Sequence, residues 1–219
     1  MLTIHHLGKS QSERIIWLCE ELGLPYVIKR YERDTVTMLS PPELKALHPL
    51  GTAPVITDGE LVLGESGAII EYIIGKYGDC DGDGRVALAL APTHPDYAQY
   101  LYWLHFANAN LQSHMGRNMM LRRLNLASDN PTLVGTKERL DRALALLEAH
   151  LDHADYLAGR EFTAADIMIV FSLTTMRYFL PLDLTAYPHI LAYLERIGKR
   201  EGYQRAMKKG DPGMALLLT

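Results

Sequence analysis

Cysteine is scarce in this chain, long apolar runs are missing, and positive charge is not in excess. Only two of the 219 residues are cysteines, Cys19 and Cys80, and they lack the CxxC spacing of a redox or metal motif. The formal net charge of −4 offers no footprint for nucleic acid. No apolar stretch reaches the roughly 18 residues of a membrane span, and MLTIHHLGKSQ lacks the apolar segment of a signal peptide. We therefore expect a soluble, cytoplasmic protein.

Metal-binding patterns are missing as well. The nine histidines show no HExxH or similar spacing. The stretch DCDGDG, residues 79–84, matches the opening of an EF-hand calcium loop. That loop needs a bidentate glutamate at its twelfth position, which is Leu90 in this chain. We therefore expect no metal site.

The first part of the chain alternates between strand and helix signals. A strand is predicted at residues 2–6, a helix after Ser10 and a second strand at 26–31. Strands in a β-α-β unit of this length are expected to be parallel. Further along, Asp58-Gly59 indicates a β-hairpin, and ESGAIIEYIIGKYG predicts a helix. Residues 1–78 thus have the element order of a small thioredoxin-like α/β domain.

The rest of the chain is predicted to be helical. Residues 79–93 concentrate Gly, Asp and Pro, which is a linker composition, and strand signals end there. Helical stretches are predicted at 94–123, 132–154, 163–179 and 188–199. The second of them carries a stripe of leucines, Leu140, Leu144, Leu147 and Leu151. We therefore expect an all-helical domain over residues 94–219.

Ser10 stands at the start of the first predicted helix, and two interpretations fit it. Ser10-Gln11-Ser12-Glu13 has the pattern of a capping box, with Ser at N-cap and Glu at N3. The same placement would let the hydroxyl donate to an anion at the positive end of the helix, where a thiolate has a depressed pKa. The local sequence leaves both interpretations open and favours the cap.

Ala53-Pro54 stands at the head of the first hairpin strand. A trans proline is acceptable there, because a strand's first residue need not donate to the ladder. In a thioredoxin-like layout we expect a cis bond instead, which is inexpensive only before proline. Such a turn would expose the Ala53 backbone to an extended peptide ligand.

Glu65-Ser66 opens the helix after the hairpin and can be read as an ordinary N-cap. A helix N-terminus also binds carboxylates, and the Glu65 carboxylate would attract an ammonium group. A ligand end that carries both charges, an amino acid, would suit the pair.

Thr163-x-x-Asp166 is a second capping-box pattern, with Phe162 as its hydrophobic staple. The helix that follows is apolar nearly all round, so it is expected to be buried and its first amides must be satisfied by the chain. We interpret this motif as structural.

Taken in order, SQSER, HPLGTAPVI, GESGAIIEYI and FTAADI make the whole chain resemble a glutathione S-transferase of the serine type found in bacteria and fungi. The resemblance implies glutathione as co-substrate, a small electrophilic substrate and a homodimer active in detoxification. It also implies that Ser10, four residues before Arg14, activates the thiol, with Ser12 as the alternative.

The resemblance assigns the rest of the glutathione site by position. The backbone of Ala53, ahead of Pro54, would pair with the cysteinyl part of glutathione. Glu65 and Ser66 would hold the γ-glutamyl amino and carboxylate groups. Thr52 stands where many relatives have lysine, so a contact to the glycyl carboxylate is in question.

Two other positions bear on the type of enzyme. Gly67 replaces an arginine of the insect-type serine enzymes. Cys19 lies nine residues after Ser10, in mid-helix, which argues against members that act through a mixed disulfide.

The implied mechanism begins with a hydrogen bond from Ser10 to the glutathione sulfur. This bond and the helix dipole would lower the thiol pKa from about 8.5 toward neutrality. The proton can leave to water, so no general base is required. The thiolate would then attack an electrophilic carbon or a peroxide oxygen.

The electrophile site is expected on the first helix of the helical domain. His105, Asn108 and Gln112 share one face of it at i, i+3 and i+7, although they can equally be the polar face of an amphipathic helix. The neighbouring apolar residues are expected in the core: Trp103, Leu104 and Phe106.

Two rival functions are compatible with this fold. One is a non-catalytic binding or interaction module, against which the retention of Ser10, Glu65 and Ser66 counts. The other is a glutathione-dependent disulfide reductase, which no feature of the sequence rules out.

Overall fold

The computed structural model describes residues 1–78 and 87–219. The chain divides into two compact units, Met1–Ala89 with Gly198–Ala215 and Leu90–Ile197 with Leu216–Thr219. The calcium-loop resemblance at DCDGDG, together with Cys80, lies outside the described residues. The division of the chain into 1–78, 79–93 and 94–219 stays a prediction.

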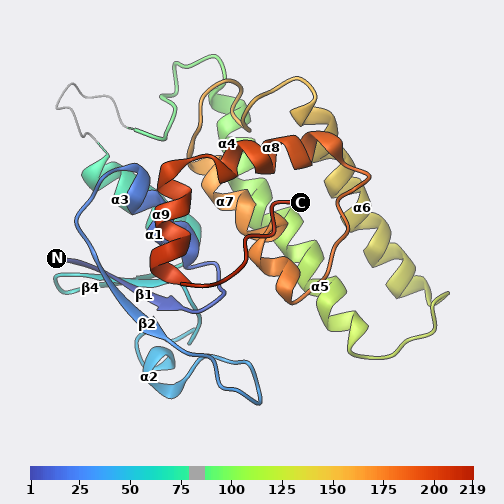
Figure 1. Cartoon of the computed structure of the whole chain (residues 1–219), viewed down its shortest axis with the longest axis horizontal. Helices are drawn as coiled ribbons and strands as arrows, with labels where there is room; N and C mark the ends of the chain where they lie inside the picture. Colours follow the sequence, from blue (N-terminus) through green and yellow to red (C-terminus); the bar gives the residue numbers. More distant parts are fainter. Residues whose placement is uncertain (79–86) are drawn as a thin grey trace. The chain divides into compact units, whose positions relative to one another are not determined.

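A four-stranded mixed sheet forms the centre of the first unit (Figure 1). Its strands are β1 (Leu2–Leu7), β2 (Val27–Tyr31), β3 (Val55–Asp58) and β4 (Leu61–Gly64), in the spatial order β2-β1-β3-β4. β1 runs parallel to β2, as the β-α-β pattern predicts, and antiparallel to β3. β3 and β4 form the predicted hairpin, with Gly59 in its turn at φ +63°, where glycine is the preferred residue. The sheet confirms the thioredoxin-like prediction.

Helices α1, α2, α3 and α9 belong to the same unit; their bounds are Glu13–Glu21, Pro42–Lys45, Ser66–Tyr77 and Glu201–Gly210. The apolar face predicted for α1 is buried, namely Ile15, Ile16, Leu18, Cys19 and Leu22. α1 packs against α3 and against α9, which comes from the far end of the sequence and lies beside it in Figure 1. The sequence pattern did not predict a helix at 201–210, where the structure has α9.

Charged side chains attach α9 to α1. The Arg205 Nε donates to Glu20 Oε2 at 2.9 Å, and Arg200 donates to both carboxylate oxygens of Glu21 at 2.9 and 2.8 Å. A Cβ at Gly202 would lie 2.6 Å from the Glu21 carboxyl carbon. The glycine therefore leaves room for the Glu21 carboxylate in the position where it pairs with Arg200.

The second unit is built from the predicted helices: α4 (Tyr97–Phe106), the π-helical segment η1 (Ala107–Gln112), α5 (Ser113–Arg122), α6 (Pro131–Leu151), α7 (Ala164–Leu173), the 3₁₀ turn η2 (Thr175–Tyr178) and α8 (Pro188–Gly198). The leucine stripe of α6 is buried, and so are Trp103, Leu104 and Phe106, as predicted. Among the residues that the structure describes, no helix is long and apolar enough to cross a membrane.

The capping box at the start of α7 is formed as predicted. Asp166 Oδ2 accepts hydrogen bonds from the Thr163 backbone N–H at 2.9 Å and from its hydroxyl at 3.3 Å. Asp166 Oδ1 accepts from the Leu157 N–H and from the Tyr193 hydroxyl, both at 3.0 Å. Asp166 is fully buried, so one carboxylate satisfies four donors at the end of a helix that solvent does not reach.

Replacing this carboxylate is expected to destabilise the fold. Asp166→Ala leaves four donors without their acceptor, and we expect a loss of roughly 2–4 kcal/mol in the free energy of unfolding. Urea denaturation followed by circular dichroism measures it as a lower midpoint at unchanged slope. Asp129→Ala, at an exposed position, is the control, and an equal midpoint for both variants would contradict the assigned role.

Candidate functional site

Ser10 and Ser12 lie in the turn between β1 and α1, in which Lys9 has φ +52°. α1 starts at Glu13 with Ser12 at its N-cap, so Glu13 is the first helical residue and not the third. The predicted capping box from Ser10 to Glu13 is therefore wrong. The Ser10 Oγ still accepts the Ser12 backbone N–H, at 3.3 Å, within the turn.

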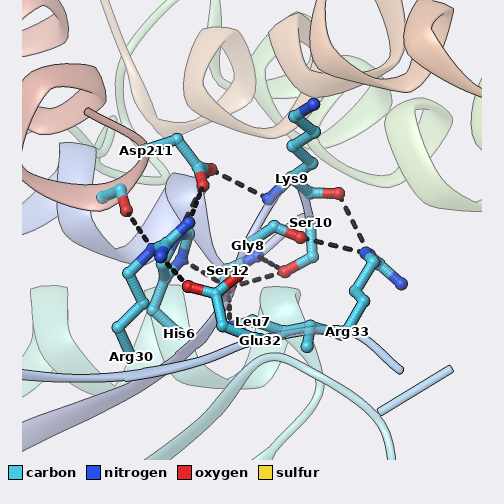
Figure 2. Close-up of polar contacts among 11 residues, drawn as sticks. His6, Leu7, Gly8, Lys9, Ser10, Ser12, Arg30, Glu32, Arg33 and Asp211 are labelled. Atoms are coloured by element: carbon cyan, nitrogen blue, oxygen red, sulfur yellow. Dashed lines mark hydrogen bonds and ion pairs between the residues drawn. The ribbon is translucent and has the colours of Figure 1, made fainter. Parts of the chain in front are cut away.

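The two serine hydroxyls are hydrogen-bonded to each other and to a histidine of β1. Ser10 Oγ lies 2.7 Å from Ser12 Oγ, which lies 2.9 Å from His6 Nδ1 and accepts the Leu7 backbone N–H at 3.3 Å. Figure 2 shows this cluster at the end of β1. Ser12 and His6 are 0% exposed, whereas Ser10 is 5% exposed. Of the two serines, only Ser10 has any surface for a ligand to contact.

His6 is followed in the cluster by a carboxylate. Its Nε2 lies 3.3 Å from Oδ2 of Asp211, the C-cap residue that follows α9. Asp211 also accepts the Lys9 backbone N–H at 2.9 Å and pairs with the Arg30 guanidinium at 3.1 Å. Burial works to raise the pKa of Asp211, but the contacts with His6, Lys9 and Arg30 outweigh it and lower the pKa to about 2. Asp211 is therefore a carboxylate at neutral pH.

The Ala53-Pro54 peptide bond is cis, as predicted. The Ala53 carbonyl accepts a hydrogen bond from the Gln11 side-chain amide at 3.2 Å. Gln11 precedes α1 directly after Ser10, so this bond joins the turn that holds Ser10 to the turn that precedes β3.

Glu65 and Ser66 lie where α3 begins. The N-cap residue is Glu65 and Ser66 is the first helical residue, so a capping role for the Ser66 hydroxyl is wrong. Glu65 has φ +68° and ψ 118°, a backbone conformation that is sparsely populated by residues other than glycine and that is often found at binding sites. Its side chain is exposed, whereas Ser66 is 1% exposed.

Gln11 and Arg14 join these parts of the site, although sequence analysis assigned them no binding role. The Ser66 hydroxyl donates to Gln11 Oε1 at 3.3 Å. Arg14 donates to the same Gln11 oxygen at 3.0 Å and to Ser66 Oγ at 3.4 Å. Burial lowers the pKa of Arg14 to about 9 against the raising effect of Glu13, so the guanidinium is charged at pH 7. Gln11 thus connects Ala53 with Ser66, and Ser10 is its neighbour in the chain.

Cys19 is excluded as the reactive thiol of this unit. It is 0% exposed, and burial, assisted by the nearby Glu20, raises the pKa of its thiol to about 12. Reactive cysteines need an accessible thiolate. The structure therefore agrees with the sequence-based argument against a cysteine-type site at this position.

The expected electrophile residues lie in the second unit. His105 is exposed, and Asn108 and Gln112 are half-buried. The segment η1, which contains Asn108 and Gln112, is π-helical, and a π-helix has more residues per turn than an α-helix. The i, i+3, i+7 spacing on which the prediction rested is that of a regular α-helix. A pocket of about 370 Å³ between α5 and α6 contains none of the three. Their role stays a prediction.

No group of three or more potential metal ligands is found among the residues that the structure describes.

Comparison with known proteins identifies the family. Residues 10–74 match the family described as "Glutathione S-transferase, N-terminal domain", and residues 97–201 match "Glutathione S-transferase, C-terminal domain". Glutathione S-transferase 3 of Schizosaccharomyces pombe is 33% identical over 239 aligned positions, which cover 100% of this chain and 92% of that protein.

Solved structures show the same fold. A glutathione S-transferase from Actinobacillus pleuropneumoniae superposes with a TM-score of 0.85 at 34% identity, over 96% of this chain and 93% of the other. A glutathione transferase from Phanerochaete chrysosporium, solved with oxidized glutathione, has a TM-score of 0.75 at 24% identity, over 95% and 94%. The whole-length similarity at more than 30% identity, the two matched domains and the thioredoxin-like unit together show that this chain belongs to the glutathione S-transferase family.

Proposed function

We propose that this protein is a glutathione transferase that binds glutathione in its first unit and activates the thiol with Ser10. The observation that carries the proposal is the connection through Gln11, whose side chain contacts the Ala53 carbonyl and Ser66 while its backbone adjoins Ser10. These groups are the three that family resemblance assigns to the cysteinyl backbone, the γ-glutamyl end and the sulfur.

Each group has chemistry that suits its assigned part of glutathione. The Ala53 backbone, ahead of the cis bond to Pro54, offers a carbonyl to the cysteinyl N–H. Ser66 stands at the first turn of α3, where the helix dipole and the backbone N–H groups attract the γ-glutamyl carboxylate. Glu65 is exposed beside it and can meet the ammonium group. Arg14, charged and buried under Ser66, adds positive charge close to that carboxylate.

Ser10 is the better candidate for the thiol contact than Ser12. A hydroxyl that donates to a thiolate must reach the ligand, and Ser12 is fully enclosed by protein. A thiolate next to Ser10 would also lie near the N-terminal end of α1, where the helix dipole favours negative charge.

We further propose that the thiolate attacks a small electrophile or a hydroperoxide held by the second unit near His105, Asn108 and Gln112. A homodimer located in the cytoplasm and a role in detoxification belong to the same proposal. Disulfide reduction remains the alternative reaction. In it the glutathione thiolate would attack a bound disulfide, and Cys19, which is buried, would not supply the attacking thiolate. A binding module without catalysis is the other alternative. It would be indicated if the protein bound glutathione but left the glutathione thiol un-ionised at neutral pH.

Ser10→Ala is expected to leave glutathione bound with an ordinary thiol. In the unaltered protein the thiolate absorbance of the complex should appear with a midpoint near neutral pH. In the variant the midpoint should return to about 8.5, which lowers the thiolate fraction at pH 7 about 10-fold or more. Calorimetry measures binding in parallel, and Ser128→Ala, at an exposed position, is the control. An unchanged midpoint in Ser10→Ala would show that another group activates the thiol.

His105→Ala tests the electrophile site. We expect a changed ratio of kcat/KM values between aromatic electrophiles and organic hydroperoxides, because a polar side chain would favour oxygen-containing substrates. His153→Ala, a histidine of the same unit with 82% side-chain exposure, is the matched control. If both variants keep the substrate profile of the unaltered protein, His105 has no part in the site.

A further inference from the structure

We propose that His6 is the proton acceptor for the glutathione thiol, reached through Ser12 and Ser10, and that Asp211 stabilises the resulting imidazolium. The inference rests on the proposed function and goes beyond it, because a serine that only donates to a thiolate needs no general base. His6 and Asp211 act through Ser10 and are therefore positioning and relay residues.

The geometry forms an unbroken path from Ser10 into the protein. Ser10 Oγ lies 2.7 Å from Ser12 Oγ, and Ser12 Oγ lies 2.9 Å from His6 Nδ1. On the other side of the imidazole ring, His6 Nε2 lies 3.3 Å from Asp211 Oδ2. Figure 2 shows these side chains together at the end of β1. Within the described part of the chain, the buried His6 Nε2 makes no hydrogen bond, and Asp211 is its ion-pair partner.

The hydroxyl of Ser12 couples the directions of the hydrogen bonds along the path, so that they can only reverse together. A serine oxygen has one proton to donate and two lone pairs to accept. One lone pair of Ser12 Oγ takes the Leu7 backbone N–H. The other lone pair and the proton must therefore serve His6 Nδ1 and Ser10 Oγ, in one order or the other.

When His6 Nδ1 carries no proton, it can only accept. Ser12 then donates to His6 and accepts from Ser10, so the Ser10 proton points inward. Ser10 Oγ also accepts the Ser12 backbone N–H, and its remaining lone pair is free for an external donor. This arrangement suits a neutral thiol that donates its S–H to Ser10.

When His6 Nδ1 carries a proton, every direction reverses. His6 donates to Ser12, Ser12 donates to Ser10, and both lone pairs of Ser10 are occupied from within the protein. The Ser10 proton then has to point outward, where it can only donate. This arrangement suits a thiolate, so the presence or absence of a proton on His6 Nδ1 decides which form of glutathione Ser10 prefers.

The step that connects the two arrangements is a balanced proton transfer. The S–H bond of glutathione breaks and its proton goes to Ser10 Oγ, the Ser10 proton goes to Ser12 Oγ, and the Ser12 proton goes to His6 Nδ1. Each hydroxyl gains one proton and loses one. The products are a thiolate and an imidazolium, and histidine is the side chain that exchanges protons near neutral pH.

The charges around His6 favour this product. Asp211 is 5% exposed and its carboxylate faces Nε2. Arg30 offsets part of that charge through its pair with Asp211, although Arg30 is itself paired with Glu32. Arg33 donates to the backbone carbonyls of Gly8 and Lys9, and the Asp211 carboxylate works to raise its pKa against the larger lowering effect of burial. Lys9 contributes its backbone N–H to Asp211.

The fate of the thiol proton tests the relay. Calorimetry of glutathione binding at pH 7, in buffers of different ionisation enthalpy, counts the protons released, and the thiolate absorbance counts the thiolate formed. The relay predicts thiolate formation with almost no proton released, because His6 retains it. S-methyl glutathione, which has no thiol proton, measures the protons exchanged by other groups. Release of about one proton per thiolate in the unaltered protein would overturn the proposal.

Variants of the relay give the second readout. His6→Asn retains a polar group near Ser12 but cannot take up the proton, so the thiolate that forms should be accompanied by about one released proton. Asp211→Asn should raise the midpoint of thiol ionisation by about 1 pH unit or more. His5→Asn is the matched control on the same strand, since His5 contacts Tyr31 and Thr57 instead, and it should change neither quantity.

Folding of each variant is checked by circular dichroism and by its affinity for S-methyl glutathione. If His6→Asn does not fold, Asp211→Asn decides the question by its thiol midpoint, and an unchanged midpoint overturns the relay. A bound thiolate that keeps its midpoint in both variants also overturns the relay and leaves the transferase function intact. No glutathione binding by the unaltered protein overturns the proposed function together with the relay.

Discussion

The packing of α9 against α1 is the contact on which the candidate site depends. The rings of Trp17 and Tyr203 pack edge to face with their centroids 4.9 Å apart, and Gly202 leaves room for the Glu21 carboxylate that pairs with Arg200. Asp211 directly follows α9 in the chain. The packing of α9 against α1 therefore places the Asp211 carboxylate beside His6 of β1. The position of one carboxylate is therefore set by the whole length of a helix–helix interface, and not by the loop in which it lies.

A carboxylate in this place has to be compensated, since an unpaired buried charge is costly. Arg30 and the Lys9 backbone N–H supply that compensation. The Asp211 carboxylate still faces the fully buried His6 imidazole. The hydroxyls of Ser12 and Ser10 lie between that imidazole and the candidate ligand position. Ser10 is thereby part of a polar network whose other members include residues of β1, β2 and the end of α9.

Local patterns were sufficient to predict most of the fold. The alternation of apolar residues, the turn at Gly59 and the capping box at Asp166 each depend on residues a few positions apart, and all three are present in the structure. The site was predicted less completely. The cap at Ser10 failed because an additional turn precedes α1, which no periodicity reveals. Gln11 and Asp211 gain their roles from contacts across the unit, and α9 carries so much charge that its apolar face is short.

The discontinuity of the first unit has a consequence for how the protein is made. Lys9 and Asp211, which share a hydrogen bond, are 202 positions apart in the sequence, and residues Leu90–Ile197 of the second unit lie between them. A ribosome completes the sheet long before it releases α9, so the nascent first unit lacks the surface that covers α1. Contacts at such separation form late and slow the folding of a domain. The turn that holds Ser10 therefore acquires its final environment only after residues 90–197 and α9 have been synthesised.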